Sequence, residues 1–337
     1  MIKKSSIKIT IYAFVVIAFS SNSCNTVDNE VQSLEPIKTY SNIGEENFFK
    51  NVYSLTTYEQ NVYFIDGTSR SIFVCNEDLN LISKISSRGR GPGELQYPFR
   101  ICIDPTGILN VLDSRTIKRY DSSGSYMGEL RTRVSSDTRF CMIDSSYFFS
   151  LVDPIKNTSI IRINSVGEEV SFLNPLQYTS KNKIQNSVGN WKHVCLVGDN
   201  HLASIGVYFP SIELIDLKSN KCETIKVDQK EFRETYQYYE SLVENSPNMS
   251  FSIVKDTYYS GGKLYVLIYY RPDGKTSIRC NTLLIFSIDQ SKITLSKVVY
   301  LRSSNDKLAY ITTFCILPCD RILAFDYYSS SFLLYKL

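Results

Sequence analysis

Four cysteines recur at one place in a repeating pattern of the sequence, and thiols placed in this way could bind a soft metal. They lie in short apolar runs around Cys102, Cys141, Cys195 and Cys315. The alternative is that each thiol fills a crowded position in an innermost strand, where only a small apolar side chain fits. We favour this alternative and expect neither a metal nor a cofactor, because the sequence has no CxxC motif and no His-Cys ligand spacing.

Four apolar runs end in an aspartate that enters a turn, and grouped carboxylates could bind a cation. These residues are Asp66, Asp113, Asp153 and Asp326. The competing interpretation is that their side chains accept hydrogen bonds from nearby backbone N–H groups, as aspartate commonly does in turns. We favour the turn role and keep Asp66, Asp113 and Asp326 as candidates for a binding face.

Histidine is scarce, because His193 and His201 are the only two in the chain. A Ser-His-Asp triad or a zinc site with several histidines therefore lacks support, and we assign no catalytic residue. His193 comes just before an apolar run, which makes it a candidate for the mouth of a central channel. Placement in the core or on the surface without a function is the interpretation that we favour.

A glycine-rich loop carries further charged candidates. Its sequence is Arg88-Gly89-Arg90-Gly91-Pro92-Gly93-Glu94. Glycine permits positive φ angles and proline stiffens the connection, so the loop is expected to hold one shape. Arg88, Arg90 and Glu94, together with Arg100 a few residues later, are candidate residues of the binding face.

The first 23 residues have the pattern of an export signal. Lys3, Lys4 and Lys8 precede an uncharged run over residues 9–19, which is shorter than the ~20 residues that a membrane span needs. Cys24 follows directly and resembles the cysteine of a bacterial lipobox, whose thiol is lipidated and becomes the mature N-terminus. Ser21 stands where the lipobox usually has Leu, and ordinary signal cleavage before Cys24 is the alternative.

Residues 24–33 are polar and acidic, which predicts a flexible tether between the lipid and a folded domain over residues 34–337. Asp28 and Glu30 resemble the acidic surface-export signals of Bacteroidetes lipoproteins. We therefore expect an outer-membrane lipoprotein, anchored to the membrane through its N-terminal lipid, that faces the periplasm or the cell surface.

The overall composition is that of a globular protein, with 43% hydrophobic and 21% charged residues among 337. This balance excludes wholesale disorder and a multi-span membrane protein. There are 37 basic and 34 acidic residues, and loss of the three lysines of the export signal leaves 34 of each. A near-neutral chain has no bulk attraction for nucleic acid, so we expect no nucleic-acid partner.

A repeat of about fifty residues runs through the chain. Its second apolar run starts near residues 61, 108, 147, 201, 263 and 321, and each run is followed by a third strand. Six copies at this spacing predict an all-β fold, a six-bladed β-propeller of four-stranded antiparallel blades. The sixth copy stops after its third strand, at Leu337. We expect residues 34–40 to return and pair with Phe332–Lys336, which closes the ring and removes an open edge.

The stretch from Asn61 through the glycine-rich loop to Leu130 resembles the six-bladed β-propeller lipoproteins of Bacteroidetes, distant relatives of NHL-repeat propellers. The GxGPGE loop and the alternation of aspartate, turn and strand carry this resemblance over residues 40–131. It implies the fold and an envelope location, but no biochemical activity.

Long connections are expected to gather on one face of the propeller. In an antiparallel blade the turn between strands two and three lies on the same face as the crossover to the next blade. The aspartate turns, the glycine-rich loop and two long connections, 174–190 and 228–250, would meet there. The second contains a predicted helix, with Phe232, Tyr236 and Tyr239 at helical spacing, which we expect to pack on the propeller.

This face is the expected binding site, because long loops on a rigid scaffold usually carry function. The favoured hypothesis is an envelope-anchored binding or interaction module for a small molecule, glycan, peptide or partner protein. The rival hypothesis is a propeller enzyme, a lyase or hydrolase with its site at the channel mouth.

Overall fold

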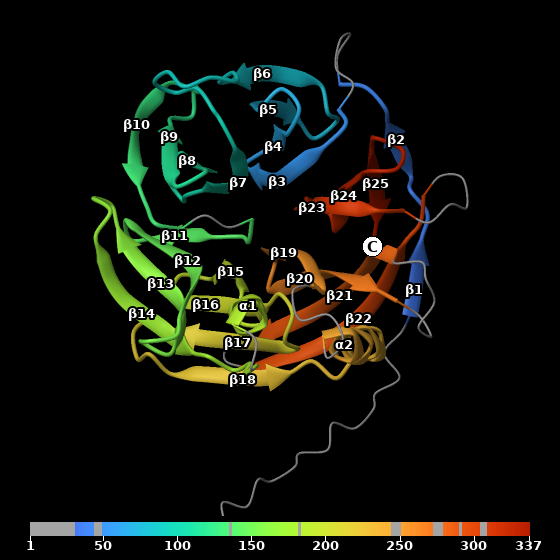
Figure 1. The fold of residues 1–337 in the computed structure, drawn as a ribbon. Helices are drawn as coiled ribbons and strands as arrows, with labels where there is room; N and C mark the ends of the chain where they lie inside the picture. The colour runs from blue at the N-terminus through green and yellow to red at the C-terminus, as the bar shows by residue number, and fades with distance from the viewer. Residues whose placement is uncertain are drawn as a thin grey trace, which may run out of the picture.

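Six β-sheets form blades around a central axis, as Figure 1 shows. The computed structural model describes residues 31–43, 49–134, 137–180, 183–243, 251–271, 279–289, 292–303 and 309–337. Each blade has four consecutive antiparallel strands or three completed by a strand from the chain start. The predicted all-β, six-bladed propeller is therefore confirmed.

The first three blades follow one another along the chain. Blade 1 contains β3 (Val52–Tyr58), β4 (Asn61–Asp66), β5 (Ser71–Asn76) and β6 (Leu81–Ile85). Blade 2 contains β7 (Pro98–Ile103), β8 (Leu109–Asp113), β9 (Thr116–Tyr120) and β10 (Tyr126–Arg131). Blade 3 contains β11 (Cys141–Ile143), β12 (Ser146–Asp153), β13 (Thr158–Asn164) and β14 (Glu169–Pro175).

The remaining blades complete the ring. Blade 4 contains β15 (Lys192–Val197), β16 (His201–Gly206), β17 (Ser211–Asp216) and β18 (Cys222–Lys226). Blade 5 contains β19 (Val254–Ser260), β20 (Lys263–Tyr270), β21 (Arg279–Asp289) and β22 (Lys292–Leu301). Blade 6 contains β23 (Ile311–Leu317), β24 (Arg321–Asp326) and β25 (Ser331–Lys336).

The burial of the strands explains their composition. In the second strands β4 and β24 every residue after the first is buried, because neighbouring blades cover both faces of the sheet. Four of the five residues of the outer strand β6 are exposed. The apolar cores lie between adjacent blades: Phe64 of blade 1 packs on Phe332 of blade 6, with ring centroids 5.0 Å apart.

The start of the chain closes the ring, although not over the whole predicted segment. Strand β2 (Lys38–Tyr40) pairs antiparallel with β25, with Lys38 opposite Leu334 and Tyr40 opposite Phe332, and supplies the fourth strand of blade 6. Figure 1 shows β2 beside β25, next to the neighbouring blade 1. The predicted pairing is thus confirmed for residues 38–40.

Residues 31–34 differ from their prediction. They form β1 (Val31–Leu34), which pairs in parallel with β22 and makes blade 5 a five-stranded sheet. Leu34 is buried in the core between blades 5 and 6, which favours an ordered strand, and Pro36 lacks the N–H needed to continue a ladder. The prediction of a tether to residue 33 was therefore wrong for residues 31–33, and the placement of Leu34 on blade 6 was wrong too. Residues 24–30 lie outside the described residues.

Two helices lie in the long connections. Helix α1 (Lys183–Val188) precedes blade 4, and α2 (Lys230–Val243) connects blades 4 and 5. Phe232 and Tyr239 of α2 are buried in the core that the two blades share, so the prediction that this helix packs on the propeller is confirmed. Neither helix of the described chain is long and apolar enough to cross a membrane.

Candidate functional site

A layer of polar side chains crosses the axis of the ring, with one residue from each blade. Its members are Ser54, Arg100, Arg139, His193, Asp256 and Thr313, and all six are buried. They occupy corresponding places: Ser54, Arg100, Asp256 and Thr313 each follow a register shift near the start of an innermost strand. The repeat therefore brings together residues that are far apart in sequence.

Asp256 is the centre of this polar layer. Arg139 Nε lies 2.6 Å from Oδ1 and Arg139 Nη2 lies 2.8 Å from Oδ2, so the guanidinium and the carboxylate meet at two points. The hydroxyl of Thr313 donates to Oδ2 at 2.7 Å. Arg139 Nη2 also reaches the carbonyl oxygens of Leu55 and Phe314, at 3.1 and 3.2 Å. These contacts connect four blades.

Arg100 approaches the same carboxylate from the pocket side. Its Nη1 lies 3.4 Å from Asp256 Oδ1 and donates to the carbonyl of Tyr53 at 3.1 Å, and its Nε donates to the carbonyl of Asp137. Two guanidinium groups thus share one carboxylate. The carboxylate of Asp137 also acts electrostatically on Arg100.

The surroundings of Asp256 and His193 shift both pKa values downward. Burial alone would raise the pKa of Asp256, but Arg139 and Arg100 outweigh it and hold the pKa well below its usual range. Burial, reinforced by Arg100, lowers the pKa of His193 from 6.5 to about 3. The backbone N–H of Arg139 donates to His193 Nδ1 at 2.9 Å, which places the proton of the neutral ring on Nε2.

A layer of thiols lies two residues further along the innermost strands. Cys102, Cys141, Cys195 and Cys315 occur in β7, β11, β15 and β23, as the sequence predicts. Each of them is a free thiol. Among the described residues, no group of three His, Cys, Asp or Glu side chains is arranged to hold a metal ion.

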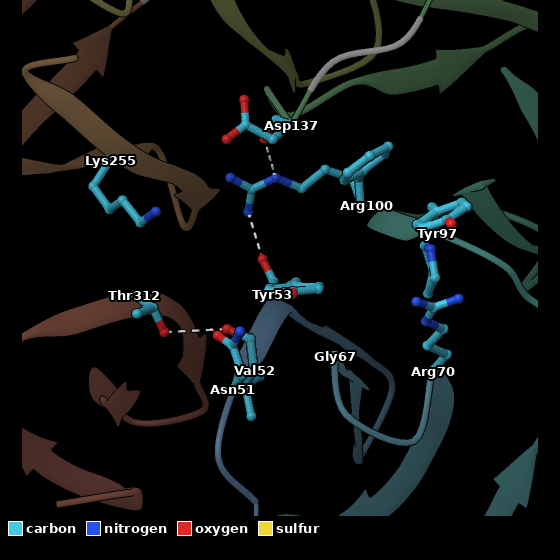
Figure 2. Close-up of a pocket in the computed structure, with 12 residues that line it drawn as sticks. Asn51, Val52, Tyr53, Gly67, Arg70, Tyr97, Arg100, Asp137, Lys255 and Thr312 are labelled. Carbon is cyan, nitrogen blue, oxygen red and sulfur yellow. Dashed lines mark hydrogen bonds between the residues drawn. The ribbon is translucent and has the colours of Figure 1, made fainter. Parts of the chain in front are cut away.

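A cavity of about 370 Å³ opens where the innermost strands begin. It is lined by the first or second residue of four innermost strands, Val52, Pro98, Lys255 and Thr312, and by the turn between β4 and β5. Figure 2 shows the guanidinium of Arg100 between Lys255 and the pair formed by Arg70 and Tyr97. Because the strands alternate in direction, this is the face that also carries the crossovers between blades.

Aromatic rings and cations share the lining of the cavity. The guanidinium of Arg70 lies 4.5 Å from the ring centroid of Tyr97, and Tyr53 and Tyr97 are 40% and 56% exposed. Gly67 lets the Tyr53 ring lie against the turn, since a Cβ at this glycine would meet the ring at 2.5 Å. Within the described part of the chain, neither Arg70 nor Lys255 forms an ion pair.

The aspartates proposed from sequence accept hydrogen bonds from backbone N–H groups. Asp66 accepts from the N–H of Ser69 at 2.7 Å, which fixes its own turn. Asp113 and Asp326 accept from Tyr97 and Tyr310 at 2.5 and 2.7 Å and so hold the crossovers that enter β7 and β23. All three are buried, and they do not come together.

The other sequence candidates lie in different places. Arg88 and Arg90 are exposed on the crossover between β6 and β7, and Glu94 accepts from the N–H of Gly91 at 2.7 Å within the same loop. Arg100 lies at the floor of the cavity. His193 is 2% exposed and belongs to the polar layer, so it lies in the core, one of the two favoured placements, and not at the channel mouth. Cys24 lies outside the described residues.

Sequence analysis missed Asp256, Arg139, Lys255, Arg70 and Tyr97. A signal for the polar layer was present, since a polar residue stands two positions before each recurring cysteine: Arg100, Arg139, His193 and Thr313. In a strand, residues i and i+2 point to the same side, so these side chains had to share the axis with the thiols. Asp256 breaks the pattern because Tyr258 stands where the cysteine would be.

Comparison with known proteins identifies the family. The family model described as a 6-bladed beta-propeller, DUF5128, matches residues 42–225, which is more than half of the chain. The chain belongs to this DUF5128 propeller family. A search of curated proteins found no match.

Solved structures similar to this DUF5128 propeller show the same fold. A member of the duf4221 family from Bacteroides vulgatus is 9% identical, with a TM-score of 0.58, and the match covers 90% of this chain and 97% of that one. A putative exported protein from Bacteroides fragilis is 10% identical, with a TM-score of 0.55 and 88% of each chain covered. A streptogramin B lyase is 9% identical, with a TM-score of 0.50, over 89% of this chain and 97% of the lyase.

Proposed function

We propose that this protein is an envelope-anchored binding module whose ligand enters the cavity lined by Tyr53, Tyr97, Arg70 and Lys255. The observation that carries the proposal is a concave site of about 370 Å³ with exposed aromatic rings and with two cations, Arg70 and Lys255, that form no ion pair within the described residues. Surface tyrosines and cations without a counter-charge do little for stability, whereas they suit ligand recognition. The rigid ring below holds the lining residues in place.

An enzyme has less support as a function. The described lining of the cavity provides one carboxylate, that of Asp137, and no histidine. Acid–base chemistry by a lyase or a hydrolase commonly uses two groups with different protonation states. The polar layer contains His193 and Asp256, but both side chains are buried and accept hydrogen bonds from Arg139.

A carbohydrate and peptide array tests the binding proposal. Labelled protein is applied to arrays of neutral glycans, acidic glycans and peptides. The double variant Tyr53→Ala/Tyr97→Ala is expected to lose the signals of the wild type, and Ile82→Ala, on the exposed outer strand β6, is expected to keep them. Signals that survive in the double variant would place the binding elsewhere. Cleavage of an arrayed compound would favour the enzyme.

Membrane anchoring is a separate part of the proposal. If Cys24 carries the lipid, Cys24→Ser abolishes labelling by a fatty-acid probe and moves the protein from the membrane fraction to the soluble fraction. The matched control Cys222→Ser changes another cysteine and is expected to leave both results unchanged. Undiminished labelling of Cys24→Ser would refute the lipid anchor.

A further inference from the structure

The floor of the cavity offers a hydrogen-bond donor without an acceptor. Arg100 is only 4% exposed, and its Nε and Nη1 donate to carbonyl oxygens of Asp137 and Tyr53. Within the described residues, Nη2 makes no hydrogen bond, and in Figure 2 it points towards Lys255. A guanidinium nitrogen that opens onto a cavity can donate to an acceptor of a ligand, and hydrogen bonds from a charged donor are strong.

Lys255 adds a second cation on the same side. It is the second residue of the innermost strand of blade 5, one residue before Asp256, and in Figure 2 its amine extends towards the guanidinium of Arg100. The nearby carboxylate of Asp256 is already shared by Arg100 and Arg139. The carboxylate of Asp137 also lines the cavity and acts electrostatically on Arg100, so the described lining carries one carboxylate against three cations, Arg70, Arg100 and Lys255. An anion between Arg100 and Lys255 would balance this charge.

The rest of the lining indicates the shape of the ligand. Tyr53 and Tyr97 present exposed rings, and Arg70 stacks on Tyr97 with its charge still available. Asn51 and Thr312 provide polar groups at the rim. Aromatic faces beside polar groups suit the alternating C–H and O–H surfaces of a sugar ring. The volume of about 370 Å³ is in the lower part of the ~300–1,000 Å³ range of ligand pockets.

We propose that the cavity binds an acidic sugar, with its carboxylate between Arg100 Nη2 and Lys255 Nζ and its ring against Tyr53 or Tyr97. The inference rests on the proposed function and names the ligand class of that site. A peptide carboxylate would satisfy the same cations. It is less favoured, because the described lining has aromatic and polar groups where a peptide needs a free strand edge or an apolar side-chain pocket.

Calorimetric titration with matched probes tests this inference. D-galacturonate and D-galactose differ in the carboxylate, and N-acetyl-alanyl-alanine offers a carboxylate on a peptide. We expect wild-type protein to bind galacturonate at least about tenfold more tightly than galactose, the effect of one charge-assisted hydrogen bond or more. Lys255→Gln is expected to remove this preference. Lys263→Gln, in the next strand of the same blade, where the side chain pairs with Asp320, is expected to retain it.

The outcomes separate the two proposals. Equal binding of both sugars, or galacturonate binding that survives Lys255→Gln, would overturn the acidic-sugar inference, while loss of that binding in Tyr53→Ala/Tyr97→Ala would still support the cavity as the site. Binding of the dipeptide through Lys255 without binding of galacturonate would also overturn it. Absence of galacturonate binding to the wild type counts against the inference as well. Sugar binding whose affinity is unchanged in every cavity variant would contradict the proposed function itself.

Discussion

Arg139 Nε and Asp256 Oδ1 lie 2.6 Å apart on the axis of the ring, although the two residues are separated by 117 positions in sequence. The second guanidinium nitrogen of Arg139 continues to carbonyl groups of blades 1 and 6. Around the circumference of a propeller each blade contacts only its two neighbours. The ion pair between Arg139 and Asp256 connects blades 3 and 5 across the centre. The same carboxylate contacts Arg100, which lines the cavity of the candidate site.

Removing the central carboxylate is expected to destabilise the protein. Asp256→Asn leaves Arg139 and Arg100 buried without their counter-charge, and breaking such a pair lowers the free energy of unfolding by about 3–5 kcal/mol. As a control, Lys230→Gln interrupts the pair of this exposed lysine with Glu234 and should change the free energy of unfolding by less than about 0.5 kcal/mol. Urea unfolding measures both. Similar small losses in the two variants would show that the axial pair does not hold the ring.

Stability is expected to fall as the pH falls below about 6.5. The folded state keeps His193 neutral with a pKa of about 3, whereas the unfolded chain protonates it near 6.5, so protons favour unfolding in this window. The loss approaches about 1.4 kcal/mol for each pH unit. The lowered pKa of Asp256 adds a further loss below about 3.8, where the unfolded carboxyl takes up its proton.

The variant His193→Asn isolates the histidine contribution, because its amide oxygen can accept the Arg139 N–H without titrating. Melting temperatures of wild type and variant between pH 4 and 8 provide the comparison. The wild type should lose more stability than His193→Asn between pH 6.5 and 4. Parallel curves would contradict a buried neutral His193.

The two strands at the chain start should contribute separately to ring closure. A protein that begins at Val31 retains β1 and β2, one that begins at Glu35 loses β1, and one that begins at Ser41 loses both. Loss of β1 removes buried Leu34 and should lower the free energy of unfolding by about 1.5–3 kcal/mol. Loss of β2 as well should lower it further, because blade 6 then has an open edge. Equal unfolding midpoints for the last two proteins would show that β2 does not close the ring.

The thiols of the inner layer should remain unpaired and react slowly. Burial raises the pKa of Cys102 to about 12, and the pKa values of Cys141, Cys195 and Cys315 also rise, so little thiolate is present at neutral pH. A maleimide probe followed by mass mapping should label exposed Cys222 and Cys319 first and the inner thiols only after unfolding. A disulfide between two inner cysteines, found under non-reducing conditions, would contradict the blade alignment.

The repeat made most of the fold predictable. The second strands began where the apolar runs began, for example at Asn61, His201 and Lys263, because middle strands are covered on both faces and must be apolar. The path of residues 31–34 was not predictable in this way. Val31–Leu34 is short, with polar Gln32 and Ser33 at its centre, and only its packing on blade 5 decides that it forms a strand.

The site was predictable only in part. Arg100 was identified as a candidate residue of the binding face, and the face with the turns and crossovers was identified from topology alone. Lys255 and Asp256 were missed because a charged pair in a strand resembles an exposed position, and only the ring geometry turns Asp256 inwards. The turn aspartates gave a stronger pattern, but their carboxylates bond to the backbone.

A crystal structure of the protein soaked in D-galacturonate would show whether the cavity beside Arg100 is a ligand site for an acidic sugar. We expect electron density for the sugar in this cavity, with the carboxylate within hydrogen-bond distance of Arg100 Nη2 and Lys255 Nζ and the ring against Tyr53 or Tyr97. Galacturonate bound only on the opposite face or beside α2, or a cavity that stays free of it under the same soak, would contradict the claim.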